Sequence, residues 1–446
     1  MSENFRVERD TMGEMHVPIN AMYGPQTQRA VENFPISSLR LPRAFIRALG
    51  LIKASAAAVN NRPEVEHAAL EIADGRHDEQ FVVDVFQTGS GTSTNMNANE
   101  VIGRLANAHP NDHVNQGQSS NDVIPTAMHV SAAIEVTHAL LPAMRSLQKA
   151  LEAKAHEFHG VVKIGRTHLQ DAVPMRLGQE FSGYAAQVRN SVERVEAALP
   201  GIYELALGGT AVGTGLNAQP GFAEAVIRQL SEHTGLPFTE ARNHFEAQAS
   251  KDAVVFLSSA LRNYAVSLTK IANDIRWLGS GPRCGLGELK LPETQPGSSI
   301  MPGKVNPVIA ESILMVCAQV IGYDATIAWC GAAGNLELNV MMPVMAYDIL
   351  QSIDLLAAGT RNFEIRLVSG LEANAERASS LVEQSLAMVT VLAPEIGYEA
   401  AAGISKEAFK TGRTVREVAR EKSGIPEDRL SELMNPETQA GGAANE

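Results

Sequence analysis

Large apolar residues recur at helical spacing through the middle of the chain. One series follows alternating steps of four and three residues: Leu257, Leu261, Tyr264, Leu268, Ile271, Ile275 and Leu278. A period of ~3.5 residues places the whole series on one face of a long helix, which is typical of helices that pack side by side. The sequence GSGPRCG, which starts at Gly279, predicts the end of this helix because glycine and proline interrupt helical hydrogen bonding.

Three further segments show comparable apolar series. They consist of Leu140, Met144, Leu147, Leu151 and Phe158; of Phe181, Tyr184, Val188, Val192 and Val195; and of Met345, Ile349, Ile353, Leu356, Phe363 and Leu367. Four long helices of this kind predict an up-and-down bundle. Apolar residues outside the series, such as Val255 and Val266, predict a second buried interface, so we expect the protein to form an oligomer.

The rest of the chain has shorter elements. Residues 1–117 alternate short helical stretches with loops rich in Gly, Asn, Pro and Ser, which predicts a mixed, mostly helical N-terminal domain. Residues 118–370 contain the long helices and form the predicted central domain. Residues 371–446 return to short helices and end in PETQAGGAANE, which predicts a small C-terminal helical domain with a disordered tail. The predicted fold class is mainly α.

Composition narrows the classes of function. The 446-residue chain is 45% hydrophobic and 20% charged, and we expect no membrane span because no apolar run approaches the ~18 residues that one requires. The formal net charge of −13 argues against nucleic acid or a membrane surface as a partner, because both select dense basic patches.

Cysteine usage and the N-terminal segment both favour the cytoplasm. Cys284, Cys317 and Cys330 form no CxxC pair, so neither a disulfide framework nor a zinc site is indicated. Residues 1–15 contain acidic side chains and lack the apolar segment of a secretory signal. We therefore expect a cytoplasmic protein.

Two polar stretches in the first third of the chain are candidate ligand sites. In QTGSGTSTNMNANE, residues 87–100, Ser90 and Thr92 offer hydroxyls beside glycines that let a ligand approach the backbone. In HPNDHVNQGQSSNDVIPTAMH, residues 109–129, the candidates are Ser119, Ser120 and Asn121. They precede a helix predicted to begin near Asp122, whose N-terminus favours an anion. Helix capping alone is the structural alternative for both stretches.

Two more polar stretches follow. Thr167 and His168 lie in KIGRTHLQDA, between the predicted end of one helix and the start of the next, where a histidine is either structural or reaches a ligand. In PETQPGSSIMPGKVNP, residues 292–307, prolines and glycines exclude an ordinary helix. Ser298, Lys304 and Asn306 in this segment provide groups that suit an anion.

Together these four stretches resemble the fumarase/aspartase superfamily, and GSSIMPGKVNP at residues 297–307 matches its signature. Within that superfamily the chain is most similar to the class II fumarate hydratases. Aspartate ammonia-lyases are the enzyme alternative, but they commonly carry Thr-Gln-Leu and Pro-Ala-Lys where this chain has THL at 167–169 and PGK at 302–304. A non-catalytic member of the superfamily is a further alternative, although this chain keeps the serine, lysine and asparagine of the signature.

The resemblance implies a fold and a reaction. The family subunit has three mainly helical domains, and its long helices form a twenty-helix core in a homotetramer whose active sites are each shared by three subunits. The implied reaction is the reversible anti addition of water to fumarate, giving L-malate, through a carbanion or aci-carboxylate intermediate in the tricarboxylic acid cycle. It implies no organic cofactor and no metal.

The resemblance also implies roles for individual residues. Ser298 would be the base, Lys304 would stabilise the charge that develops, and His168 would pair with Glu311 to orient water. The implied substrate-binding residues are Ser90, Thr92, Ser119, Ser120, Asn121, Thr167, Lys304 and Asn306. A second dicarboxylate site would involve His109, Asn111 and Asp112, but Ala106, Asn107 and Ala108 stand where family members often carry a basic residue.

Overall fold

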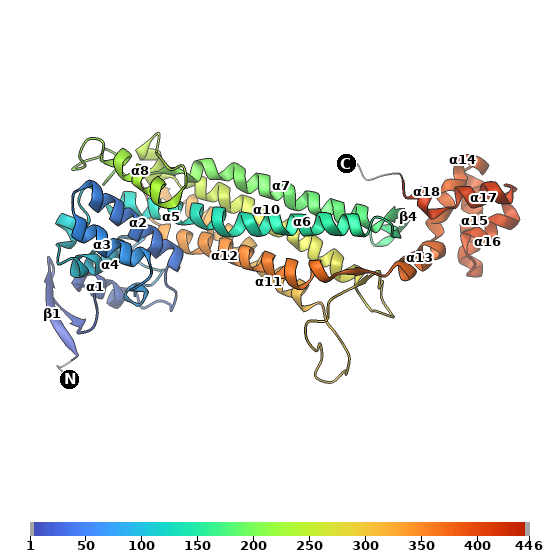
Figure 1. The fold of residues 1–446 in the computed structure, drawn as a ribbon, viewed down its shortest axis with the longest axis horizontal. Helices are drawn as coiled ribbons and strands as arrows, with labels where there is room; N and C mark the ends of the chain where they lie inside the picture. Colours follow the sequence, from blue (N-terminus) through green and yellow to red (C-terminus); the bar gives the residue numbers. More distant parts are fainter. Residues whose placement is uncertain (1–3, 442–446) are drawn as a thin grey trace. The chain divides into compact units, whose positions relative to one another are not determined.

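The computed structural model describes residues 4–441, and most of these residues are helical. Contacts divide the chain into two compact units. The first unit comprises Met1–Pro142, Ser191–Ala265 and Val316–Ala358, and the second comprises Ala143–Asn190, Val266–Met315 and Gly359–Glu446. The mainly α fold class is confirmed, and the domain boundaries expected at residues 117 and 370 stay predictions. Figure 1 follows the chain from blue to red through both units.

The first unit begins with an antiparallel hairpin in which Phe5 pairs with Pro18 and Asp10 pairs with Gly13. Its elements before the long helices are β1 (Phe5–Asp10), β2 (Gly13–Pro18), α1 (Pro25–Asn33), α2 (Arg43–Val59), α3 (Pro63–Ala73), the 3-10 turn η1 (Asp78–Gln80), α4 (Thr92–Leu105), the π-helical turn η2 (Pro110–Val114), α5 (Ser120–Glu135) and the π-helical turn η3 (Val136–Leu140). Helix α2 is buried along most of its length and packs against α3, α5 and α8. At its centre Gly50 faces the backbone of α3, where a Cβ atom would lie 2.5 Å from the Ala73 nitrogen.

The first unit contains six further short elements. They are β5 (Glu204–Leu205), α8 (Phe222–Thr234), β6 (Thr239–Glu240), α9 (His244–Ala249), β8 (Gly334–Asn335) and β9 (Leu338–Asn339). Strands β5 and β6 pair in parallel, and β8 and β9 form an antiparallel pair.

The long helices bear the apolar series expected from the sequence. They are α6 (Leu141–Glu157), α7 (Leu177–Ile202), α10 (Asp252–Leu278), α11 (Val308–Gly331) and α12 (Met342–Arg366). Every residue of the four predicted series is buried. Full burial of a side chain of this size contributes about 1.5–3 kcal/mol, so these series are a principal source of stability. Helix α10 ends at Leu278, directly before the predicted stop at Gly279.

Helix α11 differs from the other long helices because only 33% of its most apolar 18-residue window is buried. By length and composition it passes the test for a membrane-spanning helix, a test that the core helix of a soluble protein passes as well. Met315 is 68% exposed and Trp329 is 75% exposed on its uncovered face. Glu311 and Asp324 interrupt the apolar sequence of the same helix.

The second unit contains the hairpin of β3 (Val162–Thr167) and β4 (Gln170–Arg176), and the pair of β7 (Leu289–Lys290) and β10 (Glu372–Ala373). Its other elements are the 3-10 turns η4 (Val368–Gly370) and η5 (Leu386–Leu392) and the helices α13 (Ala375–Gln384), α14 (Ala393–Ile396), α15 (Tyr398–Thr411), α16 (Val415–Lys422), α17 (Glu427–Leu433) and α18 (Pro436–Gln439). Ile164 of β3 belongs to the same apolar core as Leu392, Ile404 and Val418. This core fixes the hairpin to the C-terminal helices.

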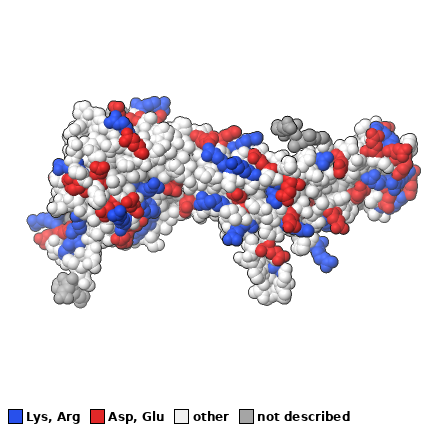
Figure 2. Space-filling view, in the orientation of Figure 1, with Lys and Arg blue, Asp and Glu red and all other residues white. Residues whose placement is uncertain are grey.

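The C-terminal helices carry many charged residues of both signs on their surface. Ion pairs of Arg416 with Glu383 and of Arg420 with Glu427 join α16 to α13 and to α17, and Figure 2 shows acidic and basic side chains interspersed over this region. Residues 436–439 of the expected disordered tail form α18 instead, and residues 442–446 lie outside the described residues.

Candidate active site

Ser298 lies at the start of a tight turn within the long segment that precedes α11. Its Oγ accepts hydrogen bonds from the backbone N–H groups of Ile300, at 3.2 Å, and Met301, at 3.0 Å. Two N–H donors on one hydroxyl oxygen favour negative charge at that oxygen.

The same segment closes on itself around Gly297. The Gly297 N–H donates to the Lys304 carbonyl at 2.7 Å, and the Asn306 side-chain amide donates to the Gly297 carbonyl at 2.6 Å. A Cβ atom at position 297 would lie 2.6 Å from the Lys304 oxygen, so this closure requires glycine. These two bonds hold Ser298, Lys304 and Asn306 in one compact loop.

A pocket of about 470 Å³ lies beside this loop. Its lining includes Lys304 and Asn306 from the loop, Glu311 from the first turn of α11, and Arg276 and Trp277 from the end of α10. Lys304 and Glu311 are exposed, so their charged groups are accessible to a ligand or to another chain.

His168 lies between the end of α6 at Glu157 and the start of α7 at Leu177, as expected, and it occupies the tip of the β3–β4 hairpin that joins these helices. Thr167 pairs with Gln170, and the two residues between them, His168 and Leu169, have φ angles of 55° and 59°. A turn with two left-handed central residues ordinarily uses Asn-Gly, because larger side chains are disfavoured there. Strain of this kind, at roughly 1–3 kcal/mol per residue, is a recurrent feature of functional sites. The turn presents the imidazole to the surface, where it is exposed.

Ser90 and Thr92 flank the start of α4 in the first unit. Their hydroxyls are hydrogen-bonded to each other at 2.7 Å, and Gly91 between them has a φ of 74°. A backbone hydrogen bond joins this turn to the start of α12, because the Gly89 carbonyl accepts from the Met342 N–H at 3.0 Å. These bonds fix two hydroxyls beside a helix N-terminus, as the sequence predicts.

The turn at Ser119 to Asn121 begins α5 with a capping box. The Asp122 carboxylate accepts from the Ser119 N–H at 2.9 Å, and the Ser119 Oγ accepts from the Asn121 N–H at 3.2 Å. The other oxygen of Asp122 accepts from the N–H groups of Gly208 and Thr210. Burial raises the pKa of Asp122, whereas these three N–H donors lower it. A helix start near Asp122 is confirmed, and Asp122 joins it to the loop at 208–210.

Lys53 is a buried cation behind this turn that the sequence alone did not single out. Its Nζ donates to the Asn115 side-chain oxygen at 2.9 Å, and that oxygen also accepts from Asn95 at 3.2 Å. Asn95 in turn donates to the Ser120 Oγ at 3.0 Å. Burial lowers the pKa of Lys53 to about 7, and the Asp122 charge acts in the opposite direction. A continuous polar chain thus connects Lys53 to Ser120.

The expected second dicarboxylate site lies at the π-helical turn after α4. His109 Nδ1 accepts from the Asp112 N–H at 3.1 Å, and Asn111 and Asp112 are both exposed. The adjacent pocket of about 460 Å³ is lined by two carboxylates, Glu8 and Glu100, as well as by Arg104 and His109.

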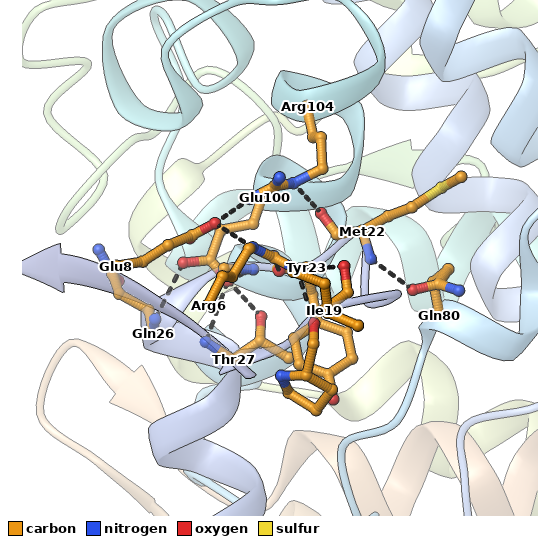
Figure 3. A network of polar contacts seen from close by, with 12 residues as sticks. Arg6, Glu8, Ile19, Met22, Tyr23, Gln26, Thr27, Gln80, Glu100 and Arg104 are labelled. Carbon is orange, nitrogen blue, oxygen red and sulfur yellow. Dashed lines mark hydrogen bonds and ion pairs between the residues drawn. The ribbon is translucent and has the colours of Figure 1, made fainter. Parts of the chain in front are cut away.

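Figure 3 shows how Arg104 is used in this pocket. Its side chain binds the Glu8 carboxylate and the Met22 carbonyl. Because the Arg104 guanidinium is already bound to these two groups, it is not free to pair with a ligand. The pocket therefore does not favour a dianion.

The structure separates the predicted residues into two groups. The first unit holds Ser90, Thr92, His109, Asn111, Asp112, Ser119, Ser120 and Asn121, and the second holds Thr167, His168, Ser298, Lys304, Asn306 and Glu311. Within residues 4–441 of one chain, no hydrogen bond or ion pair joins His168 to Glu311. In the same range, no group of three or more His, Cys, Asp and Glu side chains is placed to hold a metal ion.

Comparison with known families and proteins agrees with the resemblance. The family described as Lyase matches residues 13–322, and the family described as Fumarase C C-terminus matches residues 388–439. A curated protein named Fumarate hydratase class II from Mycobacterium tuberculosis is 56% identical, over 96% of this chain and 94% of its own length. A protein of the same name from Methylorubrum extorquens is 52% identical over 98% of both chains.

Solved structures show the same similarity in three dimensions. A recombinant class II fumarase from Schistosoma mansoni gives a TM-score of 0.95 with 41% identity, covering 98% of this chain and 99% of its own. The fumarate lyase:delta crystallin from Brucella melitensis, in its cobalt-bound crystal, gives 0.93 with 45% identity, covering 98% of this chain and 100% of its own. Because family, sequence and fold agree over nearly the whole length, the chain belongs to the class II fumarate hydratases of the lyase family.

Proposed function

We propose that this chain catalyses the reversible hydration of fumarate to L-malate. The observation that carries the proposal is the turn at Ser298, where two backbone N–H groups converge on the hydroxyl oxygen and Lys304 and Asn306 belong to the same closed loop. Within a class II fumarate hydratase, this arrangement supplies a base and an anion-stabilising group in one segment. The reaction belongs to the tricarboxylic acid cycle.

In the malate-to-fumarate direction, the Ser298 alkoxide removes the proton from C3 of malate. The electron pair left on C3 spreads into the adjacent carboxylate and gives an aci-carboxylate. Lys304 and Asn306 stabilise this added charge, and a single preorganised donor is worth about 3–4 kcal/mol in measured enzymes. The intermediate then expels the C2 hydroxyl, which leaves as water after it receives a proton.

His168 provides the proton for that departure and, in the reverse direction, orients the attacking water. Glu311 would pair with His168 and fix the tautomer of its imidazole. Because the proton is removed on one face and the hydroxyl departs from the other, the elimination is anti. Ser298 and His168 thus act on opposite faces of the substrate.

The substrate carboxylates are held by hydroxyl and amide groups at two helix N-termini. Ser90 and Thr92 stand at the start of α4, and Ser119, Ser120 and Asn121 stand at the start of α5. Backbone N–H groups at a helix N-terminus favour an anion, and Thr167 adds a further hydroxyl. A dicarboxylate is the class of ligand that suits two such anion sites.

The active enzyme is proposed to be a homotetramer in the cytoplasm, with each active site shared by three subunits. The uncovered apolar face of α11 supports assembly, because Met315 and Trp329 would otherwise remain in water. Small residues at Ala318, Gly322 and Ala325 are also exposed on this helix and permit close approach of another helix. The exposure of His168 is consistent with contacts supplied by another chain.

The proposal is tested by following fumarate absorbance after L-malate is added to the purified oligomer. We expect rapid formation of fumarate by the wild type and a loss of at least 1,000-fold in kcat for Ser298→Ala. Ser299→Ala is the matched control, because it removes the neighbouring hydroxyl, and should retain most of the activity.

Two outcomes would contradict the proposal. An assembled wild-type protein that releases ammonia from L-aspartate faster than it dehydrates malate would be an ammonia-lyase. Assembled protein with no activity on either substrate would indicate a non-catalytic member of the superfamily.

A further inference from the structure

A buried ionic cluster lies beneath the His168 turn. Glu288 is fully buried, and its two carboxylate oxygens accept from the two terminal nitrogens of Arg166, each at 3.0 Å. Lys163 Nζ lies 3.6 Å from Glu288 and 3.1 Å from Glu180. Two cations and two carboxylates balance one another, so the cluster is neutral as a whole.

Both cations of this cluster come from the hairpin that carries His168. Lys163 and Arg166 lie on β3, and Arg166 is followed directly by Thr167 and His168 at the turn. A register irregularity between Ile164 and Arg166 interrupts the strand pairing at this place. Backbone hydrogen bonds therefore hold the end of this hairpin less firmly than they would in a regular one. The two hydrogen bonds from the Arg166 guanidinium to Glu288 provide an additional attachment.

Glu288 itself is fixed by its backbone at a junction of three segments. Its N–H donates to the Leu278 carbonyl at the end of α10, and its carbonyl accepts from the Asn374 N–H, both at 2.8 Å. Strand β7 follows at Leu289–Lys290, and the loop that bears Ser298 begins directly afterwards. A single residue thus contacts the His168 hairpin and the base of the Ser298 loop.

We propose that Glu288 is a positioning residue for catalysis, which acts on His168 through the bidentate ion pair with Arg166. The proposal rests on the function proposed above. Only a carboxylate at this position offers two equivalent oxygens to the two terminal nitrogens of the Arg166 guanidinium. The pair therefore fixes the direction of β3 as well as its distance from Glu288. Misdirection of the turn would misplace the imidazole and would lower kcat more than it raises KM.

The first test compares Glu288→Gln with Glu372→Gln, an exposed glutamate on the neighbouring β10. The glutamine keeps the shape of Glu288 but leaves one Arg166 N–H without an acceptor. We expect Glu288→Gln to lower kcat by about 10- to 100-fold, the range for residues that orient a reacting group, with KM changed less than threefold. Glu372→Gln should match the wild type. Equal kcat values for Glu288→Gln and the wild type would overturn the proposal.

The second test asks whether Glu288 acts through His168. If it does, Glu288→Gln should cause little further loss in a His168→Asn background, because the group that it positions is already absent. A merely structural role would make the two losses multiply, and that result would overturn the proposal. Hydrogen exchange gives a readout besides activity: the peptide spanning residues 166–170 should exchange faster in Glu288→Gln and be unchanged in Glu372→Gln.

Arg166→Lys keeps the test decisive if Glu288→Gln does not assemble. This variant retains the positive charge and removes the fork, so it should reproduce the loss in kcat and the faster exchange at the turn. Unchanged kcat for Arg166→Lys would contradict the proposal. Failure of the proposed function gives a different result, since it would be seen as an inactive wild type or as a fully active Ser298→Ala variant.

Discussion

Glu100 offers a quantitative test of how the N-terminal segment is attached to α4. The carboxylate accepts four hydrogen bonds: from the N–H groups of Gly24, Gln26 and Thr27, and from the Thr27 hydroxyl (Figure 3). Helix α1 has no side-chain cap of its own, so Glu100 satisfies its first N–H groups from another helix.

Glu100→Gln should loosen the start of α1 by about 3 kcal/mol. In its best orientation the glutamine keeps its oxygen toward Gly24 and Thr27 and turns its NH₂ group toward the Gln26 N–H. One charge-assisted hydrogen bond, worth ~1.5–3 kcal/mol, is then lost, and the remaining three become neutral and weaker. A loss of ~3 kcal/mol corresponds to about 100-fold faster hydrogen exchange, since each 1.4 kcal/mol is a factor of ten.

Hydrogen exchange measured by mass spectrometry on peptides covering residues 22–30 checks this value. Glu32→Gln is the control, because Glu32 is exposed on the same helix and, among the described residues 4–441, accepts a hydrogen bond from the Gln28 side chain alone. It should change exchange by less than about threefold. Unchanged protection of residues 24–28 in Glu100→Gln would refute the reasoning that one carboxylate caps this helix.

The remaining predictions concern catalysis and pH. His168→Asn should lower kcat by about 10²- to 10³-fold in the malate assay while the oligomer stays intact; a kcat near that of the wild type would remove His168 from the proton-transfer role. Lys53→Met should raise KM for malate about fivefold, because the positive charge behind Ser120 is lost and with it roughly 1 kcal/mol of attraction for a substrate carboxylate. An unchanged KM would show that the Lys53 charge does not contribute to substrate binding. Burial, with a smaller effect of Lys251, lowers the pKa of His129 from 6.5 to about 4. Between these values the unfolded chain binds a proton that the folded chain does not, so the free energy of unfolding should fall as pH drops from 6.5 to 4, by up to ~3 kcal/mol. His129→Gln should flatten this decline in a urea titration series, and an equally steep decline in that variant would contradict the assignment.

The long helices were predictable because their signal is local. The series from Leu257 to Leu278 repeats every ~3.5 residues, and no knowledge of distant residues is needed to interpret it. The hairpin at His168 was missed for the opposite reason. Its turn uses His-Leu where Asn-Gly would have indicated a hairpin.

Buried charges were also missed because their partners are remote in sequence. Arg166 and Glu288 are 122 positions apart, and Lys53 is 62 positions from Asn115. Spacing along the chain carries no information about such pairs, which only the fold brings together. The roles of Ser298, Lys304 and His168 came from family resemblance, since a serine in a loop does not by itself indicate a base.

The turn at Ser298 has a consequence for how lyases of this kind diversify. Both N–H donors to the serine oxygen come from Ile300 and Met301, within the same few residues. In the proposed mechanism, activation of the base is therefore encoded in one short stretch of sequence, whereas the groups at α4 and α5 that are proposed to bind the substrate carboxylates are encoded elsewhere. Mutations that alter substrate preference can accumulate at the latter without weakening the base, so one proton-abstraction device can be inherited unchanged by enzymes with different substrates.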